Sequence, residues 1–291
     1  MKVFVTGATG FTGSHTVPFL LAKGWEMHCL YRESSNRKLL PQTEIHWHSG
    51  DLENKEQLTE YMRGCDALVN IASLGFGHAD NIIQAAQAAH IDRAIFISTT
   101  ALFTKLNSKS KSTRLAAEAA IQNSNLAFTI LRPTMIYGTP KDRNMIRLVR
   151  WVSRFPIIPI LGHGNFLQQP VFVEDVAQAI VKCMETPATI GKSYNIAGKS
   201  AITYNEVVDT IAGLMNRKIL KLHFPDRFII WVLQLVEKMN IPFPIKAEQV
   251  ERLNENKDFS NNEAQTDFGY SPRSFKEGIR GEIEAFRGFR S

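Results

Sequence analysis

Three glycines near the amino terminus are spaced for chemistry on phosphate groups. They lie in TGATGFTG (6–13), directly after an apolar run and directly before a helix-like one. The first glycine permits a tight turn, the second lets the backbone approach a pyrophosphate, and the third lets a helix sit close to a strand. Backbone N–H groups at the start of that helix would face the phosphates. The pattern predicts a dinucleotide site made of Gly7, Thr9, Gly10, Phe11, Thr12 and Gly13.

Positive charge follows the next strand-like run. In LYRESSNRK (30–38), Arg32 stands just past the run, and Arg37 and Lys38 come close behind. An acid at this place hydrogen-bonds a ribose 2′-hydroxyl, whereas an arginine accommodates a 2′-phosphate. We therefore predict NADP as the cofactor, bound by Arg32. Glu33 takes the acidic role if the strand ends one residue later, so NAD stays open as the alternative.

The order of several motifs resembles the short-chain dehydrogenase/reductase superfamily, in its extended epimerase/dehydratase branch. After the spacing TGxxGxxG come GDL (50–52), NIAS (70–73), STTALFT (98–104), LRPTMIYG (131–138) and QQPVFVEDVA (168–177). The resemblance implies that Asp51 and Leu52 border the adenine. It also implies that Ala72 and Ser73 line the path toward the nicotinamide.

The STTALFT segment supplies candidate catalytic hydroxyls. By resemblance to the family's STDEVYG segments, Thr99 matches the side chain that hydrogen-bonds the reacting oxygen of the substrate, and Thr100 is the second candidate. Either threonine can instead be a β-branched residue that finishes a strand.

The helix-like run that follows departs from the family pattern, which implies YxxxK at its start. One alignment of SKSTRLAAE (110–118) puts Arg114 at the lysine and Ser110 at the tyrosine. The other uses Ser110 and Lys111 as the S–K pair and puts Asn107 at the tyrosine. Serine is too weak an acid to replace a tuned phenol, and arginine stays protonated. We therefore expect Arg114 to hold ribose hydroxyls and supply charge, with no proton transfer at Ser110.

Tyr137 is the nearest other phenol in the family's pattern, where it borders the substrate pocket. We treat it as a catalytic candidate, with a packing role as the alternative. A polar loop with Lys141, Asp142, Arg143 and Asn144 follows it. This loop either contacts an anionic substrate or is simply solvated.

Short apolar runs and amphipathic runs alternate around these motifs. The strand-like runs are 2–6, 27–31, 44–48, 67–72, 94–98 and 127–132, and the helix-like runs are 12–22, 54–63, 79–90 and 112–123. Such alternation predicts βαβ units. The fold class is therefore α/β, a Rossmann-type doubly wound parallel sheet with a smaller, mostly helical lobe.

The pattern of expected helices and strands changes after Gly138. Helices are expected over 144–155 and 173–185, a strand over 193–198, and a proline- and glycine-punctuated stretch over 156–165. Thr203 and Glu206 form a capping box for a further helix. We divide the chain into a NAD(P)-binding domain over 1–138, to which 168–185 returns, and a substrate-binding lobe over 139–291.

The composition of the 291-residue chain excludes some partners. Its net charge of +6 is spread along the chain without the basic stripe that nucleic acid requires. The three cysteines form no metal motif, so no metal is expected. The sequence has no apolar run of transmembrane length and no secretory signal, so we expect a cytoplasmic protein. Whether it forms a homodimer stays open.

Two classes of function remain open. The first is an oxidoreductase or epimerase/dehydratase that acts on a nucleotide sugar or a similar anionic metabolite. The second is a catalytically weak NADP(H)-binding sensor or assembly subunit, favoured by the departure from YxxxK. In that second class the apolar segments 150–161 and 227–238 become partner or membrane-surface contacts, although burial is the simpler account.

Overall fold

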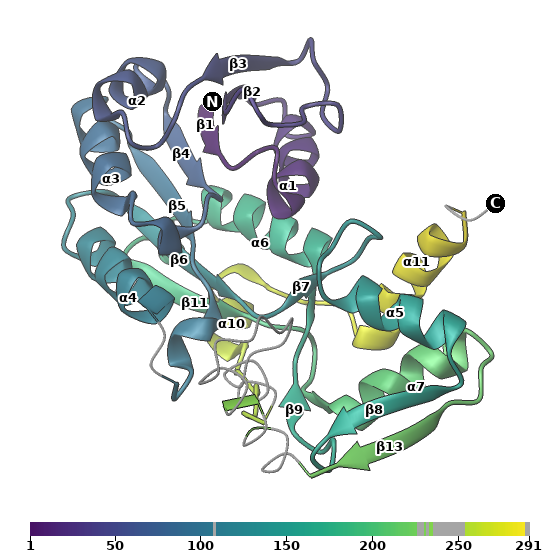
Figure 1. The fold of residues 1–291 in the computed structure, drawn as a ribbon. Coiled ribbons are helices and arrows are strands. Elements are labelled where there is room, and N and C mark those ends of the chain that lie inside the picture. The colour runs from purple at the N-terminus through teal and green to yellow at the C-terminus, as the bar shows by residue number, and fades with distance from the viewer. Residues whose placement is uncertain (107–108, 226–229, 231–232, 235–253, 289–291) are drawn as a thin grey trace.

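A parallel sheet of seven strands forms the centre of the protein within its described residues (Figure 1). The computed structural model describes residues 1–106, 109–225, 230, 233–234 and 254–288. The strand order is β11-β6-β5-β4-β1-β2-β3, and every neighbouring pair is parallel. The strands are β1 (Lys2–Thr6), β2 (Glu26–Tyr31), β3 (Ile45–Ser49), β4 (Ala67–Asn70), β5 (Arg93–Ile97), β6 (Phe128–Pro133) and β11 (Lys192–Ile196).

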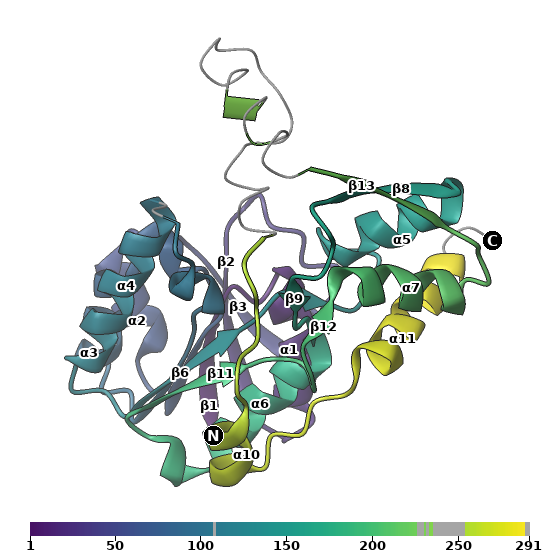
Figure 2. The ribbon, with the colours of Figure 1, turned by 90° about the horizontal axis from the view of Figure 1, so that it is seen from below.

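Helices cover both faces of this sheet, as Figures 1 and 2 show. One face carries α1 (Phe11–Leu21) and α6 (Val173–Glu185), and the other carries α2 (Lys55–Met62), α3 (Ala79–Ala88) and α4 (Lys109–Gln122). Successive side chains of a strand point to opposite faces. Val3 and Val5 therefore belong to the apolar core beneath α1 and α6, and Phe4 belongs to the other core. Burial on both faces explains why the strands are nearly all apolar.

The predicted fold class is confirmed. Each of the six predicted strands forms, with ends that differ from the prediction by at most two residues. The strand order reverses between β1 and β4, and in such open sheets ligands bind at this point beyond the carboxyl ends of the strands. The glycine turn after β1 and the NIAS segment after β4 both open onto this crevice.

A smaller lobe lies beyond the carboxyl ends of the strands (Figure 1). Its helices are α5 (Met145–Arg154), α7 (Tyr204–Leu214) and α11 (Phe275–Gly288), which share a core that includes Val149, Ile211 and Ile279. Two-residue strands pair as β7 (Ile136–Tyr137) with β10 (Val171–Phe172) and β9 (Leu167–Gln168) with β12 (Ile202–Thr203). The short 3-10 helices are η1 (Leu74–Phe76), η2 (Thr100–Phe103) and η3 (Pro187–Thr189).

One strand of this lobe differs from the sequence expectation. The stretch that was expected only as punctuated by proline and glycine contains β8 (Ile157–Leu161), paired in parallel with β13 (Leu220–Phe224). Ile158 and Ile160 are buried, while Ile157 and Pro159 are exposed, which is the alternation of a half-buried strand. Its partner lies about sixty residues later, so the local sequence could not reveal the pairing.

The chain returns to the first domain further than predicted. Helix α6, which lies within the stretch 168–185, packs against α1. However, β11 also joins the main sheet beside β6, and α10 (Asn262–Phe268) packs against β11. The Tyr194 hydroxyl donates to Asp267 Oδ2 at 2.6 Å and fixes this contact. In the described part of the chain, no helix has the length and apolar character needed to cross a bilayer.

Candidate active site

The glycine turn between β1 and α1 has a backbone that only glycine fits. Gly7 has a φ of +73°, and a Cβ there would lie 2.6 Å from the backbone nitrogen of Ala72. A Cβ on Gly13 would collide with the carbonyl oxygen of Gly7. Gly10 is the N-cap of α1 and makes no side-chain cap, so the first-turn N–H groups of the helix face outward. The turn is a cradle for an anionic group.

A cleft of about 450 Å³ opens above this turn. The predicted cofactor residues that line it are Gly7, Thr9, Gly10, Phe11, Thr12, Gly13, Arg32, Asp51, Leu52, Ala72 and Ser73. These residues come from four separate segments, each of which follows a different strand of the sheet. Asp51 Oδ1 accepts a hydrogen bond from the backbone N–H of Glu53 at 3.0 Å, which fixes the turn after β3. The structure thus brings these predicted residues to one cleft.

The loop after β2 contributes more donors than the sequence analysis named. Ser34, Ser35 and Asn36 also line the cleft. The backbone N–H of Ser35 donates to the carbonyl oxygen of Arg32 at 2.7 Å, and the Arg32 N–H donates to Ser35 Oγ at 3.2 Å. This tight turn places hydroxyl and amide groups beside Arg32. The run SSN between Glu33 and Arg37 was the available signal, because serine and asparagine favour turns and carry hydrogen-bond donors.

The other charged residues of that loop lie elsewhere. Glu33 is exposed and is not among the described residues that line the cleft. The guanidinium carbon of Arg37 lies 4.2 Å from the ring centre of Tyr31 and 5.4 Å from that of Trp47. Arg37 therefore makes a cation–π contact rather than lining the cleft. Arg32 is the cation of this loop that faces the cleft.

A second cavity of about 210 Å³ adjoins the cleft, and Thr12, Ile71 and Ser73 line both. Besides Thr12 and Ser73, its polar lining residues are Ser98, Thr99, Arg114 and Thr134. The Ser98 hydroxyl is buried and has no hydrogen-bond partner among the described residues. A buried hydroxyl without a partner is costly, so Ser98 is suited to a hydrogen bond with a ligand. The candidates predicted from this segment were the two threonines, and Ser98 was missed.

The two candidate threonines have different surroundings. Thr99 lines the second cavity, and its Oγ1 accepts a hydrogen bond from the Ala101 N–H at 3.1 Å. Thr100 is buried, and its hydroxyl donates to the Pro133 carbonyl at 3.4 Å. Thr100 is not among the described lining residues of either cavity, so the geometry favours Thr99 and gives Thr100 a structural role.

The placement of Tyr137 corrects the catalytic role suggested for it. Its side chain is 1% exposed and packs against Phe172 and Phe275, and its hydroxyl donates to the Phe275 carbonyl at 3.3 Å. Burial raises the pKa of Tyr137 well above that of a free phenol. The ring belongs to the apolar core of the smaller lobe. Tyr137 is a packing residue.

The start of α4 brings Arg114 to the second cavity and leaves its neighbours outside. The guanidinium of Arg114 packs over Gly75, where a Cβ would lie 3.1 Å from Nε. Lys111 Nζ donates to the Thr104 carbonyl at 2.5 Å, and neither Lys111 nor Ser110 is among the described lining residues. Asn107, which the other alignment uses, lies outside the described residues. The geometry favours the alignment that places Arg114 at the cavity.

The contacts of the loop after Gly138 mainly cap helix α5. Asp142 is buried, and its Oδ1 accepts the N–H groups of Asn144 at 2.8 Å and Ile146 at 3.2 Å, at the start of α5. Lys141 and Arg143 are exposed and are not among the described lining residues of either cavity. A substrate contact by this loop remains a prediction.

Comparison with known proteins agrees with this geometry. A model of the NAD dependent epimerase/dehydratase family matches residues 3–197. Over 246 residues the chain is 28% identical to a ceramide reductase of Caulobacter vibrioides, covering 81% of this chain and 77% of that protein. Over 272 residues it is 25% identical to the mitochondrial NADH dehydrogenase (ubiquinone) 1 alpha subcomplex subunit 9 of Arabidopsis thaliana, covering 86% and 67%.

The fold is similar to that of a UDP-glucose 4-epimerase of Thermotoga maritima, solved with UDP-glucose. The TM-score is 0.80 at 16% identity, with 100% of each chain covered. At this identity the likeness concerns the fold. The family model, however, spans more than half of the sequence and contains the glycine turn and both cavities' sheet-edge residues. The chain belongs to the NAD dependent epimerase/dehydratase family.

Proposed function

We propose that this chain is an NADP(H)-dependent oxidoreductase of the epimerase/dehydratase type, acting on a nucleotide sugar or a similar anionic metabolite. The observation that carries the proposal is that the two cavities have three lining residues in common. A glycine cradle and the Arg32 loop line the first, hydroxyls and Arg114 line the second, and Thr12, Ile71 and Ser73 are common to both. This arrangement suits a dinucleotide whose redox end reaches a substrate.

The cleft residues support NADP over NAD. Arg32, together with Ser34, Ser35 and Asn36, would surround a 2′-phosphate with donors, and Glu33 lies outside this set. An acid that accepts from a 2′-hydroxyl is the usual mark of NAD sites. No such acid follows β2 among the described residues of the cleft lining. The cradle around Gly7 and Gly10 would hold the pyrophosphate in either case.

The residues of the second cavity would orient the substrate. The bound nicotinamide supplies or accepts a hydride. Ser98 and Thr99 would donate hydrogen bonds to the reacting oxygen, and Arg114 would supply positive charge to an anionic substrate. Arg114 cannot take up or release the proton, since its guanidinium stays protonated. The proton therefore comes from water, from the substrate or from a side chain beyond this lining.

A second candidate function is an NADP(H)-binding sensor or assembly subunit. Among the described residues that line the second cavity, Arg114 alone has an ionisable side chain. The sequence contains no tyrosine between Tyr61 and Tyr137. One relative is a subunit of a respiratory NADH dehydrogenase rather than an isolated reductase. These facts fit a chain that keeps the cofactor and has lost proton transfer.

Turnover assays separate the two candidates. The purified protein is incubated with NADPH or NADP and a panel of nucleotide sugars and ketones, and the nicotinamide absorbance and the sugar products are followed. Consumption of cofactor or conversion of one sugar into another supports the enzyme, and Thr99→Val should then slow the reaction. Saturable NADPH binding without turnover across the panel supports the sensor or subunit.

A further inference from the structure

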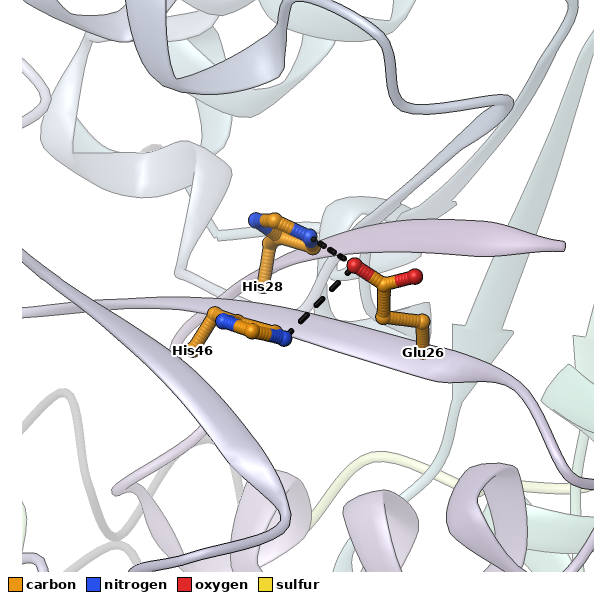
Figure 3. A group of neighbouring side chains, drawn as sticks. All are labelled: Glu26, His28 and His46. Atoms are coloured by element: carbon orange, nitrogen blue, oxygen red, sulfur yellow. Dashed lines mark hydrogen bonds and ion pairs between the residues drawn. The ribbon is translucent and has the colours of Figure 1, made fainter.

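Three potential metal ligands gather at the sheet edge, away from the cleft. Glu26 and His28 are two residues apart on β2, so both side chains lie on the same face of the sheet. His46 lies on the edge strand β3 and is paired in register with His28. In Figure 3 the two imidazole rings are stacked, and one nitrogen of each faces the same carboxylate oxygen of Glu26. The cluster precedes the carboxyl ends of β2 and β3, where Arg32 and Asp51 enter the cleft.

The distances in this cluster match those of a metal site. Glu26 Oε1 lies 3.0 Å from His28 Nε2 and 3.6 Å from His46 Nε2. One ligand atom from each of the three residues lies within 4.8 Å of the other two. A tetrahedral cation bonded at about 2.1 Å to nitrogen and oxygen ligands separates them by roughly 3.4 Å. The His28 and His46 rings are stacked, with centres 4.7 Å apart and an interplanar angle of 19°, so the exposed His46 ring must rotate before both nitrogens point at one cation.

A fourth side chain lies within hydrogen-bond distance of the central imidazole. His28 Nδ1 lies 3.0 Å from His48 Nε2, and the two rings are stacked with centres 5.2 Å apart. If Nε2 of His28 binds a cation, its Nδ1 carries the proton and donates to His48. Metal-bound histidines normally donate their second N–H to such a partner, which fixes the ring orientation. His48 in turn packs against the Tyr61 ring of α2.

We propose that Glu26, His28 and His46 form a binding site for a first-row divalent cation such as zinc, with water completing the coordination. Two imidazoles and one carboxylate are a ligand set typical of zinc with an open position. The His46 side chain is 61% exposed, so the site is reachable from solvent. The cation would tie the edge strand β3 to β2.

The ammonium group of Lys2 lies beside the proposed site and provides a further test of it. Its Nζ lies 3.6 Å from Glu26 Oε1, and its side chain is 49% exposed. A bound cation would repel this ammonium group, which must swing into solvent. Lys2→Met should therefore strengthen zinc binding several-fold. Lys23→Met is the matched control, because Lys23 pairs with Glu185 instead and should leave zinc affinity unchanged.

The test is calorimetric titration of zinc chloride into the tag-free, chelator-treated full chain. We expect one saturable site, with affinity lowered at least tenfold in His46→Ala and about 10- to 100-fold in His48→Phe, which removes the outer hydrogen bond. His163→Ala, at an exposed turn, should behave as the unmodified protein. Cobalt bound to the protein should give the visible absorption of tetrahedral nitrogen and oxygen coordination. Thermal unfolding without zinc checks that each variant folds.

Two results would overturn the site. One is the lack of saturable zinc binding by the folded, unmodified protein. The other is binding that survives His46→Ala but is lost in His78→Ala. His78 lies with Asp51 and Glu53 in another group of three possible ligands, beside the cofactor cleft. That outcome would assign the zinc to the cleft group instead.

Discussion

At the residue scale, neighbouring side chains of like type take different tasks because the backbone turns them in different directions. Arg32 faces the cleft, whereas Arg37 stacks on two aromatic rings. Thr99 lines the second cavity, whereas Thr100 donates to a backbone carbonyl in the interior. The sequence already favoured Arg32 and Thr99, and the structure adds the contacts that Arg37 and Thr100 make instead.

Replacement of Arg32 tests the cofactor preference. Arg32→Ala should weaken NADPH binding about ten- to a hundredfold and leave NADH nearly unchanged, because a charge-assisted hydrogen bond contributes about 1.5–3 kcal/mol. The control is Lys38→Ala, which removes the same charge from an exposed position outside the described cleft lining. Calorimetric titration measures both cofactors. An equal loss of NADPH and NADH affinity in Arg32→Ala would refute the role of Arg32 at a 2′-phosphate.

The hydroxyls of the second cavity are tested by turnover. Ser98→Ala and Thr99→Val should each lower kcat by an order of magnitude or more, because each removes a donor to the reacting oxygen. Ser110→Ala is the matched control and should stay within several-fold of the unmodified protein, because Ser110 is outside the described cavity lining. A collapse of kcat in Ser110→Ala with NADPH binding intact would show that α4 carries the proton route after all.

At the element scale, a buried ion pair fixes the helix that carries Arg114. Arg132 of β6 donates to the Glu118 carboxylate of α4 through Nε at 3.1 and 3.0 Å and through a terminal nitrogen at 2.6 Å. The Glu118 side chain is 6% exposed, so water screens the pair poorly. The pair sets how α4 lies on the sheet, and with it the position of Arg114 at the second cavity.

Breaking this pair should destabilise the fold. Arg132→Met should lower the free energy of unfolding by about 3–5 kcal/mol, because it leaves the Glu118 charge buried without its partner. The double variant Arg132→Met, Glu118→Leu should recover most of the loss. Urea denaturation followed by circular dichroism measures both variants. A double variant that is as unstable as Arg132→Met would show that packing, rather than the orphaned charge, is responsible.

At the scale of the whole molecule, a buried pair of carboxyl groups connects helices α5 and α11 of the smaller lobe. Glu282 of α11 is fully buried beside Asp142, which caps α5. Burial, followed by the neighbouring Asp142 carboxyl, raises the pKa of Glu282 from 4.5 to about 10. The folded chain therefore keeps a proton there at pH values at which the unfolded chain has lost it. Stability should fall as the pH rises from about 4.5 toward about 10.

The substitution Glu282→Gln should flatten this dependence. The neutral amide keeps the shape of the side chain and does not titrate, so the variant should gain stability relative to the unmodified protein as the pH increases. Glu284→Gln, an exposed position on the same helix, should keep the original slope. Thermal unfolding midpoints across pH 5–9 measure the effect. Identical slopes in the unmodified protein and Glu282→Gln would contradict it.

The main sheet could be predicted from local sequence, and the smaller lobe only in part. Buried parallel strands are short apolar runs, and the capping box at Thr203 and Glu206 forms as expected. Strand β8 was missed because its partner β13 is distant in sequence. Two apolar segments were considered as contact surfaces. The segment 150–161 contains the end of α5 and all of β8, with Trp151, Phe155 and Ile157 exposed. The segment 227–238 lies mostly outside the described residues.

The candidate site, too, could be predicted from the sequence only in part. The glycine turn follows from local backbone geometry, so its residues could be placed from sequence alone. The second cavity depends on where α4 and η2 pack against the sheet, which motif order does not specify. That is why Ser98 was missed, and why the sequence left Tyr137 open between a catalytic and a packing role. Hydroxyl and phenol side chains are common both in protein cores and in functional sites. Only the groups that surround each side chain show which of the two roles it has.

The central claim is that the cleft above Gly7, Gly10 and Gly13 binds NADP(H). The most direct measurement is a pair of calorimetric titrations, NADPH and NADH, into the unmodified protein at the same ionic strength. We predict saturable binding of one NADPH per chain, about ten- to a hundredfold tighter than NADH. Saturable binding of neither cofactor, or tighter binding of NADH, would contradict the account.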